Sequence, residues 1–166
     1  CYQHQIKLIY PSSATVYSKT TAYSKCKSIL DEIASCYLNR QSILGLRIFA
    51  GYGPGEGHKG EYASIIYQFC KAMRNGERPV IWGDGHQTRD FVYIDDIVDT
   101  IIKNKDKIEI IDIGTGISWS FNEIVNVIND ILATSIKPIY KPKPDLYIQD
   151  TICRYPIKYK VLLQDG

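Results

Sequence analysis

The chain has 166 residues, of which 45% are hydrophobic and 23% are charged, and this composition is typical of one globular domain. The net charge is only +2, too small to indicate nucleic acid as the main partner. No apolar run approaches the ~20 residues of a membrane span, and the 5 cysteines show neither zinc-ligand nor C-x-x-C spacing. We therefore expect a cytoplasmic protein with reduced thiols, no bound metal and no membrane partner.

The elements expected along the chain alternate between short apolar strands and amphipathic helices. In chain order, the pattern predicts a strand at 6–10, a helix at 22–39, a strand at 42–49, a helix at 62–75, strands at 79–82 and 88–93, a helix at 95–103, a strand at 108–113, a helix at 120–133, a strand at 136–140 and a helix at 156–163. Asp95 is expected to cap its helix, and Ser120-Phe-Asn-Glu123 reads as a capping box. This alternation predicts an α/β fold with a parallel sheet.

A glycine pattern expected of dinucleotide-binding folds is missing. Such a sheet opens with a strand, a G-x-G-x-x-G turn and a helix, and no expected strand here is followed by that pattern. The glycines at 51, 53, 55 and 57 alternate and do not fit it. The parallel strands are also too few to complete the sheet, so we expect one edge to be open and apolar.

Tyr23 and Lys27 stand four residues apart near the start of a helix, which places them on one face. A free phenol has a pKa near ~10 and is a poor base at neutral pH. A neighbouring ammonium favours the phenolate, so the pair suits proton transfer. Ser13 follows the first strand, at the edge where such folds place their chemistry. Its hydroxyl is expected to hold the substrate oxygen while Tyr23 takes the proton.

Five motifs occur in a familiar order. They are Tyr-Pro-Ser-Ser-Ala-Thr-Val-Tyr (10–17), Tyr-x-x-x-Lys (23–27), Leu-Arg-Ile-Phe-Ala-Gly-Tyr-Gly-Pro (46–54), Thr-Arg-Asp-Phe-Val-Tyr-Ile-Asp-Asp (88–96) and Asp-Ile-Gly-Thr-Gly (112–116). Together they resemble the extended short-chain dehydrogenases/reductases of the NAD-dependent epimerase/dehydratase family, such as UDP-galactose 4-epimerases, and match only their C-terminal half. The resemblance implies the second half of a Rossmann-like parallel sheet plus a small α/β substrate-binding domain. It assigns 1–53 and 88–116 to the cofactor-binding domain, and 54–87 and 117–166 to the substrate domain.

The same resemblance assigns roles to individual residues. Ser13 would be the hydroxyl partner, Tyr23 the acid/base, and Lys27 the residue that binds the cofactor ribose and tunes Tyr23. Further cofactor contacts would come from Ser12, Phe49 and Tyr52. The substrate would be bound by Ser13, Thr15, Ala50, His58, Trp82, Arg89 and Tyr147. A guanidinium is well shaped for a diphosphate, but Arg89 has the alternative of an ion pair with Asp90 or Asp96.

Two features bear on the reaction. Related dehydratases carry an Asp-Glu pair directly after the hydroxyl residue, and here Ala14 and Thr15 stand there, which favours epimerisation. The loop Gly55-Glu-Gly-His-Lys-Gly60 resembles that of ADP-glycero-manno-heptose 6-epimerases, in which the lysine matching Lys59 is a second base. Lys59 and His58 can equally be solvated loop residues.

The resemblance thus implies an epimerase of nucleotide-diphosphate sugars that uses bound NAD, or NADP, to remove and return hydride at a sugar carbinol. A homodimer and a separate N-terminal cofactor-binding half are the partners it suggests. The alternatives are a non-catalytic remnant or nucleotide-sugar-binding subunit, and a dehydratase or decarboxylase of the same family, disfavoured by Ala14 and Thr15.

Overall fold

The structure is a computed structural model and describes residue 4, residues 6–161 and residue 163. Its strands are β1 (Leu8–Ser13), β2 (Ile43–Ile48), β3 (Ala50–Tyr52), β4 (Val80–Trp82), β5 (Thr88–Tyr93), β6 (Glu109–Ile113), β7 (Ser118–Ser120) and β8 (Ile139–Lys141). Its helices are α1 (Ala22–Tyr37), α2 (Ile65–Arg74), α3 (Ile94–Asn104) and α4 (Phe121–Leu132), with 3-10 turns η2 (Ala14–Tyr17) and η3 (Glu56–Tyr62).

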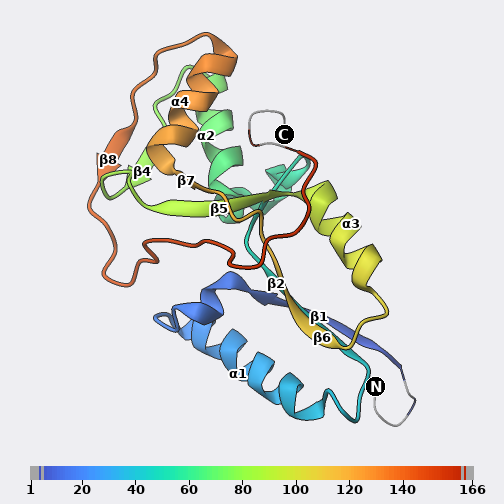
Figure 1. Cartoon of the computed structure of the whole chain (residues 1–166). Helices are drawn as coiled ribbons and strands as arrows, with labels where there is room; N and C mark the ends of the chain where they lie inside the picture. The colour runs from blue at the N-terminus through green and yellow to red at the C-terminus, as the bar shows by residue number, and fades with distance from the viewer. Residues whose placement is uncertain (1–3, 5, 162, 164–166) are drawn as a thin grey trace.

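A three-stranded parallel sheet in the order β1-β2-β6 confirms the predicted α/β fold. Figure 1 shows α1 running along one side of these strands and α3 on the other side. On the α3 side, Leu44, Leu46 and Ile113 form a buried core with residues of α3 and β5. β1 lies at one edge of the sheet, where Ile9 is 42% exposed. The expected open apolar edge is therefore present.

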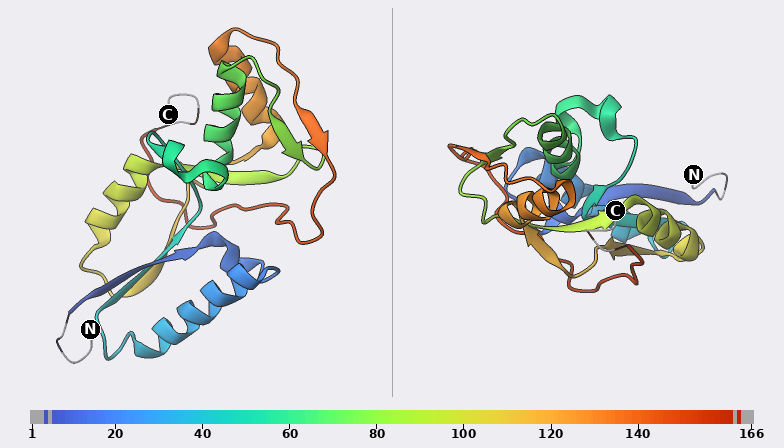
Figure 2. Two further views of the ribbon diagram at one scale, coloured as in Figure 1. Left: turned by 180° about the vertical axis from the view of Figure 1, so that it is seen from behind. Right: turned by 90° about the horizontal axis from the view of Figure 1, so that it is seen from above.

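The far end of the molecule is a lobe built on α2 and α4, which we call the α2/α4 lobe (Figure 2). The two helices pack over β5, which pairs with β3 in parallel and with β7 antiparallel. β4 pairs with β8 in a separate parallel ribbon and not with β5. The core of this lobe consists of Tyr52, Phe69, Met73, Ile81, Phe91, Phe121, Ile124, Val125 and Ile128.

The starts of the helices confirm one predicted cap and contradict another. The capping box at Ser120 and Glu123 opens α4 as expected. Asp95 does not cap α3, because the chain passes from β5 directly into the helix and Tyr93 is the residue at the cap position. Asp95 lies in the first turn instead, where a carboxylate complements the helix dipole.

The last part of the chain also differs from expectation. The predicted strand at 136–140 is confined to β8, and the predicted helix at 156–163 is not formed over 156–161. The backbone amides of this stretch are used elsewhere: Ile157 donates to Gly114 O, and Lys160 and Val161 donate to the Asp96 carboxylate. Residues 142–161, the C-terminal segment, therefore cross between the α2/α4 lobe and the three-stranded sheet (Figure 1).

Among the described residues, none of the helices combines the length and apolar character needed to cross a membrane.

Candidate active site

α1 presents Tyr23 and Lys27 beside the end of β1. The Lys27 ammonium donates to the carbonyl oxygen of Pro11 at 2.7 Å and lies 5.7 Å from the centroid of the Tyr23 ring. Tyr23 is 56% exposed, and its hydroxyl makes no hydrogen bond to the residues that the structure describes. The cation is thus fixed next to the phenol, while the phenol oxygen is open to a ligand.

The serines of the motif at 10–17 have different surroundings. The Ser13 hydroxyl accepts hydrogen bonds from the Thr15 amide at 3.3 Å and the Thr15 hydroxyl at 3.1 Å, and so caps η2. The Ser12 hydroxyl is buried and has no hydrogen-bond partner among the described residues. A buried polar group normally finds a partner, so this orphaned oxygen fits a site completed by a further group.

A cavity of about 430 Å³ opens where β1, β2 and β6 end. Thr15 and Phe49 line it from the sheet side, and Asp150 and Arg154 line it from the C-terminal segment. Ligands of α/β folds bind at the carboxyl ends of the strands, so this cavity has the expected position. Ser13, Tyr23 and Lys27 lie outside its lining.

Arg89 is held by backbone carbonyls of the C-terminal segment. Its guanidinium donates to Ile148 O at 2.7 Å and Gln149 O at 3.0 Å. It also lies 5.5 Å from the ring centroids of both Phe121 and Tyr147. Burial lowers the pKa of this guanidinium, with partial compensation from Tyr147 and Asp150. Arg89 and Tyr147, both predicted substrate contacts, therefore stand together.

The alternative given for Arg89, an ion pair with Asp90 or Asp96, is not formed, because both carboxylates have other partners. Asp90 is fully buried and accepts from the backbone amides of Thr115, Gly116 and Cys153. Asp96 accepts from the amides of the C-terminal segment, as described above. Asp90 and Asp96 thus anchor backbone amides from distant parts of the chain.

The glycine-rich loop is organised by a buried carboxylate. Glu56 accepts from the Ser64 hydroxyl at 2.6 Å, from the Ser64 amide at 2.8 Å and from the Lys59 ammonium at 3.2 Å. His58 Nδ1 lies 2.8 Å from Gly55 O, and its ring is exposed. Lys59 is therefore ion-paired within its own loop and is not free to move a proton in this state.

Three other predicted residues, Tyr52, Ala50 and Trp82, belong to the α2/α4 lobe. Tyr52 is 5% exposed and packs edge-on against Phe91 and Tyr93 in the core of the α2/α4 lobe. Ala50 is half-buried in β3, and Trp82 is exposed at the end of β4 beneath the Lys141 ammonium. The predicted residues therefore do not share one cavity: Thr15 and Phe49 line the cavity at the strand ends, and Tyr23, Arg89 and Lys59 lie outside its lining.

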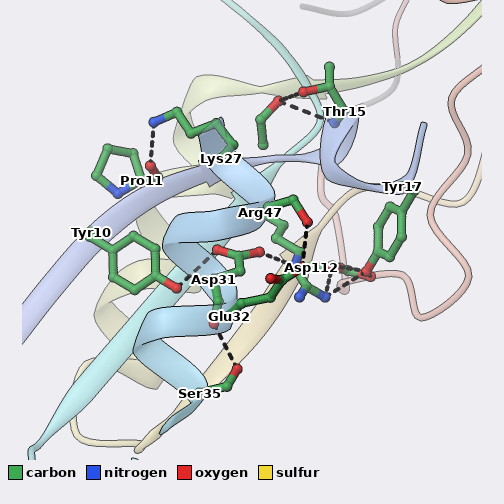
Figure 3. A network of polar contacts seen from close by, with 12 residues as sticks. Tyr10, Pro11, Thr15, Tyr17, Lys27, Asp31, Glu32, Ser35, Arg47 and Asp112 are labelled. Atoms are coloured by element: carbon green, nitrogen blue, oxygen red, sulfur yellow. Dashed lines mark hydrogen bonds and ion pairs between the residues drawn. The ribbon is translucent and has the colours of Figure 1, made fainter. Parts of the chain in front are cut away.

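One cluster was not foreseen from the sequence. Figure 3 shows Arg47 of β2 between Asp31 of α1, Asp112 of β6 and the hydroxyl of Tyr17. The sequence held a signal for it, because Asp31 follows Lys27 by one helical turn on the same face. Arg47 itself lies within the quoted motif at 46–54, but sequence reasoning gave it no role.

Comparison with known proteins identifies the family. Residues 1–114 match the sequence profile of the NAD dependent epimerase/dehydratase family. The chain belongs to this family. Among curated relatives, the ADP-L-glycero-D-manno-heptose-6-epimerase of Brachyspira hyodysenteriae is 32% identical over 89% of this chain. The match covers 51% of that relative, so the chain spans about half the length of the curated protein it resembles.

Solved structures of the family share the fold. The ADP-L-glycero-D-manno-heptose-6-epimerase of Helicobacter pylori superposes with a TM-score of 0.75 at 30% identity, covering 91% of this chain and 52% of that one. A UDP-N-acetylglucosamine 4-epimerase of Methanobrevibacter ruminantium, in complex with UDP-N-acetylmuramic acid, gives 0.81 at 27% identity, covering 92% and 55%. These neighbours confirm the resemblance drawn from the five motifs.

Proposed function

We propose that this chain supplies the C-terminal, substrate-side half of an NAD-dependent nucleotide-sugar epimerase. The observation that carries the proposal is the placement of the Lys27 ammonium, fixed to β1 and adjacent to an open phenol at Tyr23. This arrangement lies close in sequence to Thr15, which lines the cavity at the strand ends. In this proposal, 1–53 and 88–116 complete the cofactor-binding domain, and 54–87 and 117–166 form the substrate domain.

The chain's own residues would handle the proton and the sugar. Tyr23 would take the proton of a carbinol whose oxygen is held by Ser13, and Lys27 would stabilise the phenolate. Bound NAD supplies the hydride acceptor and donor that epimerisation at a carbinol requires. Ser12 and Lys27 would contact its nicotinamide side, consistent with the orphaned oxygen of Ser12.

Two cationic groups would serve the rest of a nucleotide-diphosphate sugar. Arg89 would bind the diphosphate by exchanging the carbonyls of Ile148 and Gln149 for phosphate oxygens, since a guanidinium matches either acceptor. Lys59 would act as a second base only after leaving Glu56, so a heptose-type mechanism requires the loop to rearrange. Ala14 and Thr15 supply no carboxylate for elimination of water, which supports epimerase over dehydratase.

A second candidate function is binding of a nucleotide sugar without turnover, by a chain that works as a subunit. It is favoured by the cavity at the strand ends, because Ser13, Tyr23 and Lys27 lie outside its lining. A homodimer, a separate N-terminal half and a cytoplasmic location stay predictions of either function.

The test measures binding and turnover separately. The chain, joined to an N-terminal cofactor-binding half of the family, is mixed with NAD and UDP-glucose or ADP-glycero-manno-heptose, epimers are followed by proton NMR, and UDP-glucose binding is measured by calorimetry. Tyr23→Phe should abolish epimer formation and leave binding of the nucleotide sugar intact. Tyr37→Phe, on the same helix and away from the cavity, should change neither.

Each result has a defined meaning. Turnover retained in Tyr23→Phe would remove Tyr23 from its role. Binding without epimer formation in the unaltered chain would select the non-catalytic function, and absence of both would overturn the proposal.

A further inference from the structure

The contact between α1 and the sheet is made by small and polar side chains. The buried residues of α1 are Ser24, Ser28, Asp31 and Ala34. Its large apolar residues are left partly exposed: Ile29, Leu30, Ile33 and Tyr37 are between 39% and 55% exposed. In the described part of the chain, the buried apolar cluster under the helix joins Ala34 to Tyr10 and Ile43, near its C-terminal end. Hydrophobic packing therefore does not fix the N-terminal half of α1, which carries Tyr23 and Lys27.

Arg47 occupies the centre of this polar contact (Figure 3). Its Nε donates to Asp31 Oδ2 at 2.6 Å, and one terminal nitrogen donates to the Tyr17 hydroxyl at 2.9 Å. The same nitrogen lies 3.8 Å from Asp112 Oδ1. Burial opposes the charge of Arg47, but its hydrogen bonds to Asp31 and Tyr17 outweigh burial and raise its pKa. A fixed, planar cation thus connects α1, β6 and the turn after β1.

The strands are built to accommodate this cation. Ser12, Arg47 and Asp112 are register partners, so they form one polar row across the sheet on the side of α1. Gly45 lies beneath the ring of Tyr10, where an added Cβ would be 2.6 Å from the phenol oxygen. The absence of a side chain lets Tyr10 lie over β2 and donate to Asp31 Oδ1 at 3.0 Å. Both oxygens of Asp31 are therefore held from the sheet.

We propose that Arg47 is a positioning residue for Tyr23 and Lys27. Asp31 follows Lys27 by one turn and Tyr23 by two turns, so holding Asp31 sets the height and rotation of the helix that carries them. A guanidinium–carboxylate bond fixes direction as well as distance, which small-residue packing does not. Arg47 acts through Asp31 and contacts neither Tyr23 nor Lys27. The inference rests on the proposed function for the claim that these two residues move a proton.

The test measures the local stability of α1 and the environment of the Lys27 ammonium, without substrate. The chain is prepared with Arg47→Met, with Arg47→Lys, and with Lys107→Met as a control that breaks the exposed ion pair between Lys107 and Glu109. Hydrogen exchange is measured for the amides of α1 and α4, and the ¹⁵N-labelled ammonium resonance of Lys27 is assigned with Lys27→Arg.

In Arg47→Met we expect the amides of α1 to exchange hydrogen about tenfold faster and those of α4 to be unchanged. The reason is that the substitution lowers the free energy of local opening of α1 and does not affect opening of α4. The Lys27 resonance should move toward the position of solvated lysines, because its bond to Pro11 O is lost. Arg47→Lys should give an intermediate shift, since an ammonium is a point charge and lacks the planar fork. Lys107→Met should match the unaltered chain.

Other outcomes overturn the inference. Equal acceleration of α1 and α4 would make Arg47 a general stabiliser, and an unmoved Lys27 resonance would deny it a positioning role. If Arg47→Met does not fold, Asp112→Asn is used in its place. In this variant Arg47 keeps its bond to Asp31, so the Lys27 resonance should shift less than in Arg47→Lys. Absence of a shift in both Asp112→Asn and Arg47→Lys would overturn the inference. Because no ligand is used, these results stand whether or not the proposed function survives its own test.

Discussion

α1 and α4 are both amphipathic helices, yet they bury opposite kinds of faces. α4 buries Phe121, Ile124, Val125 and Ile128 in the core of its lobe. α1 instead buries its small and polar face, and its isoleucines face outward. The spacing of apolar residues therefore shows which face of a helix is apolar, but it does not show which face packs against the sheet. α1 is held to the sheet by the partly buried ion pair of Arg47 and Asp31, whereas α4 is held in its lobe by hydrophobic contacts.

The difference suits the two regions to different tasks. The core of the α2/α4 lobe is apolar, and such packing gives a stable framework without directional detail. In the proposed function, the layer formed by α1 and the three-stranded sheet would hold the Tyr23 phenol and the Lys27 ammonium at defined points, for which hydrogen-bonded charges are better suited.

The largest predicted difference between the two helices is in the free energy of unfolding after an isoleucine in each is replaced by alanine. Ile124→Ala in α4 removes a side chain that is 1% exposed and should lower the free energy of unfolding by about 2–5 kcal/mol. Ile33→Ala in α1 removes one that is 54% exposed and should change it by less than about 0.5 kcal/mol. Urea unfolding of both variants measures the two values. A cost in Ile33→Ala as large as in Ile124→Ala would show that the outer face of α1 is packed in solution.

A smaller effect should appear beneath α1. Gly45→Ala places a Cβ against the ring of Tyr10, and the resulting overpacking should cost about 1–3 kcal/mol. In a Tyr10→Leu background the same change should cost less, because the ring that the Cβ meets is gone. A double-mutant cycle from urea unfolding measures the coupling. Additive costs would contradict the close approach of Tyr10 to β2.

Sequence patterns correctly predicted the helices and strands whose formation depends on local capping and on the burial of an apolar face. The helix at 120–133 was marked by its capping box and apolar period, and the strand at 108–113 by its apolar run, and both were confirmed within a few residues. The helix at 156–163 was wrong over its described part because Asp96, more than 60 residues earlier, takes the amides it would have used. Asp95 failed as a cap for a related reason, since the local pattern does not show that β5 leads straight into α3.

In the candidate site, too, local spacing was visible in the sequence but contacts between distant segments were not. The spacing of Tyr23 and Lys27 was visible in the sequence, since a helix converts four residues into one face. The role of Arg47 was not, because its partners come from α1, β6 and the turn after β1, and only the register of the strands brings them together. The pairing of Lys59 with Glu56 was missed because the burial of Glu56 depends on Ser64, which lies outside the glycine-rich pattern.

The smallest predicted effect extends the comparison to pH, because a charged anchor titrates and an apolar core does not. Burial opposes the charge of Glu56, but bonds from Ser64 and Lys59 outweigh it and lower the pKa of this carboxyl. A carboxyl whose pKa is lower in the folded state adds stability at neutral pH, and this is lost as pH falls through the folded pKa. Glu56→Gln should therefore cost about 1 kcal/mol at pH 7 and flatten the fall of the melting temperature below about pH 4.5. Glu61→Gln, an exposed carboxylate of the same loop, should leave the curve as it is; an identical acid slope in Glu56→Gln would show that Glu56 does not anchor the loop.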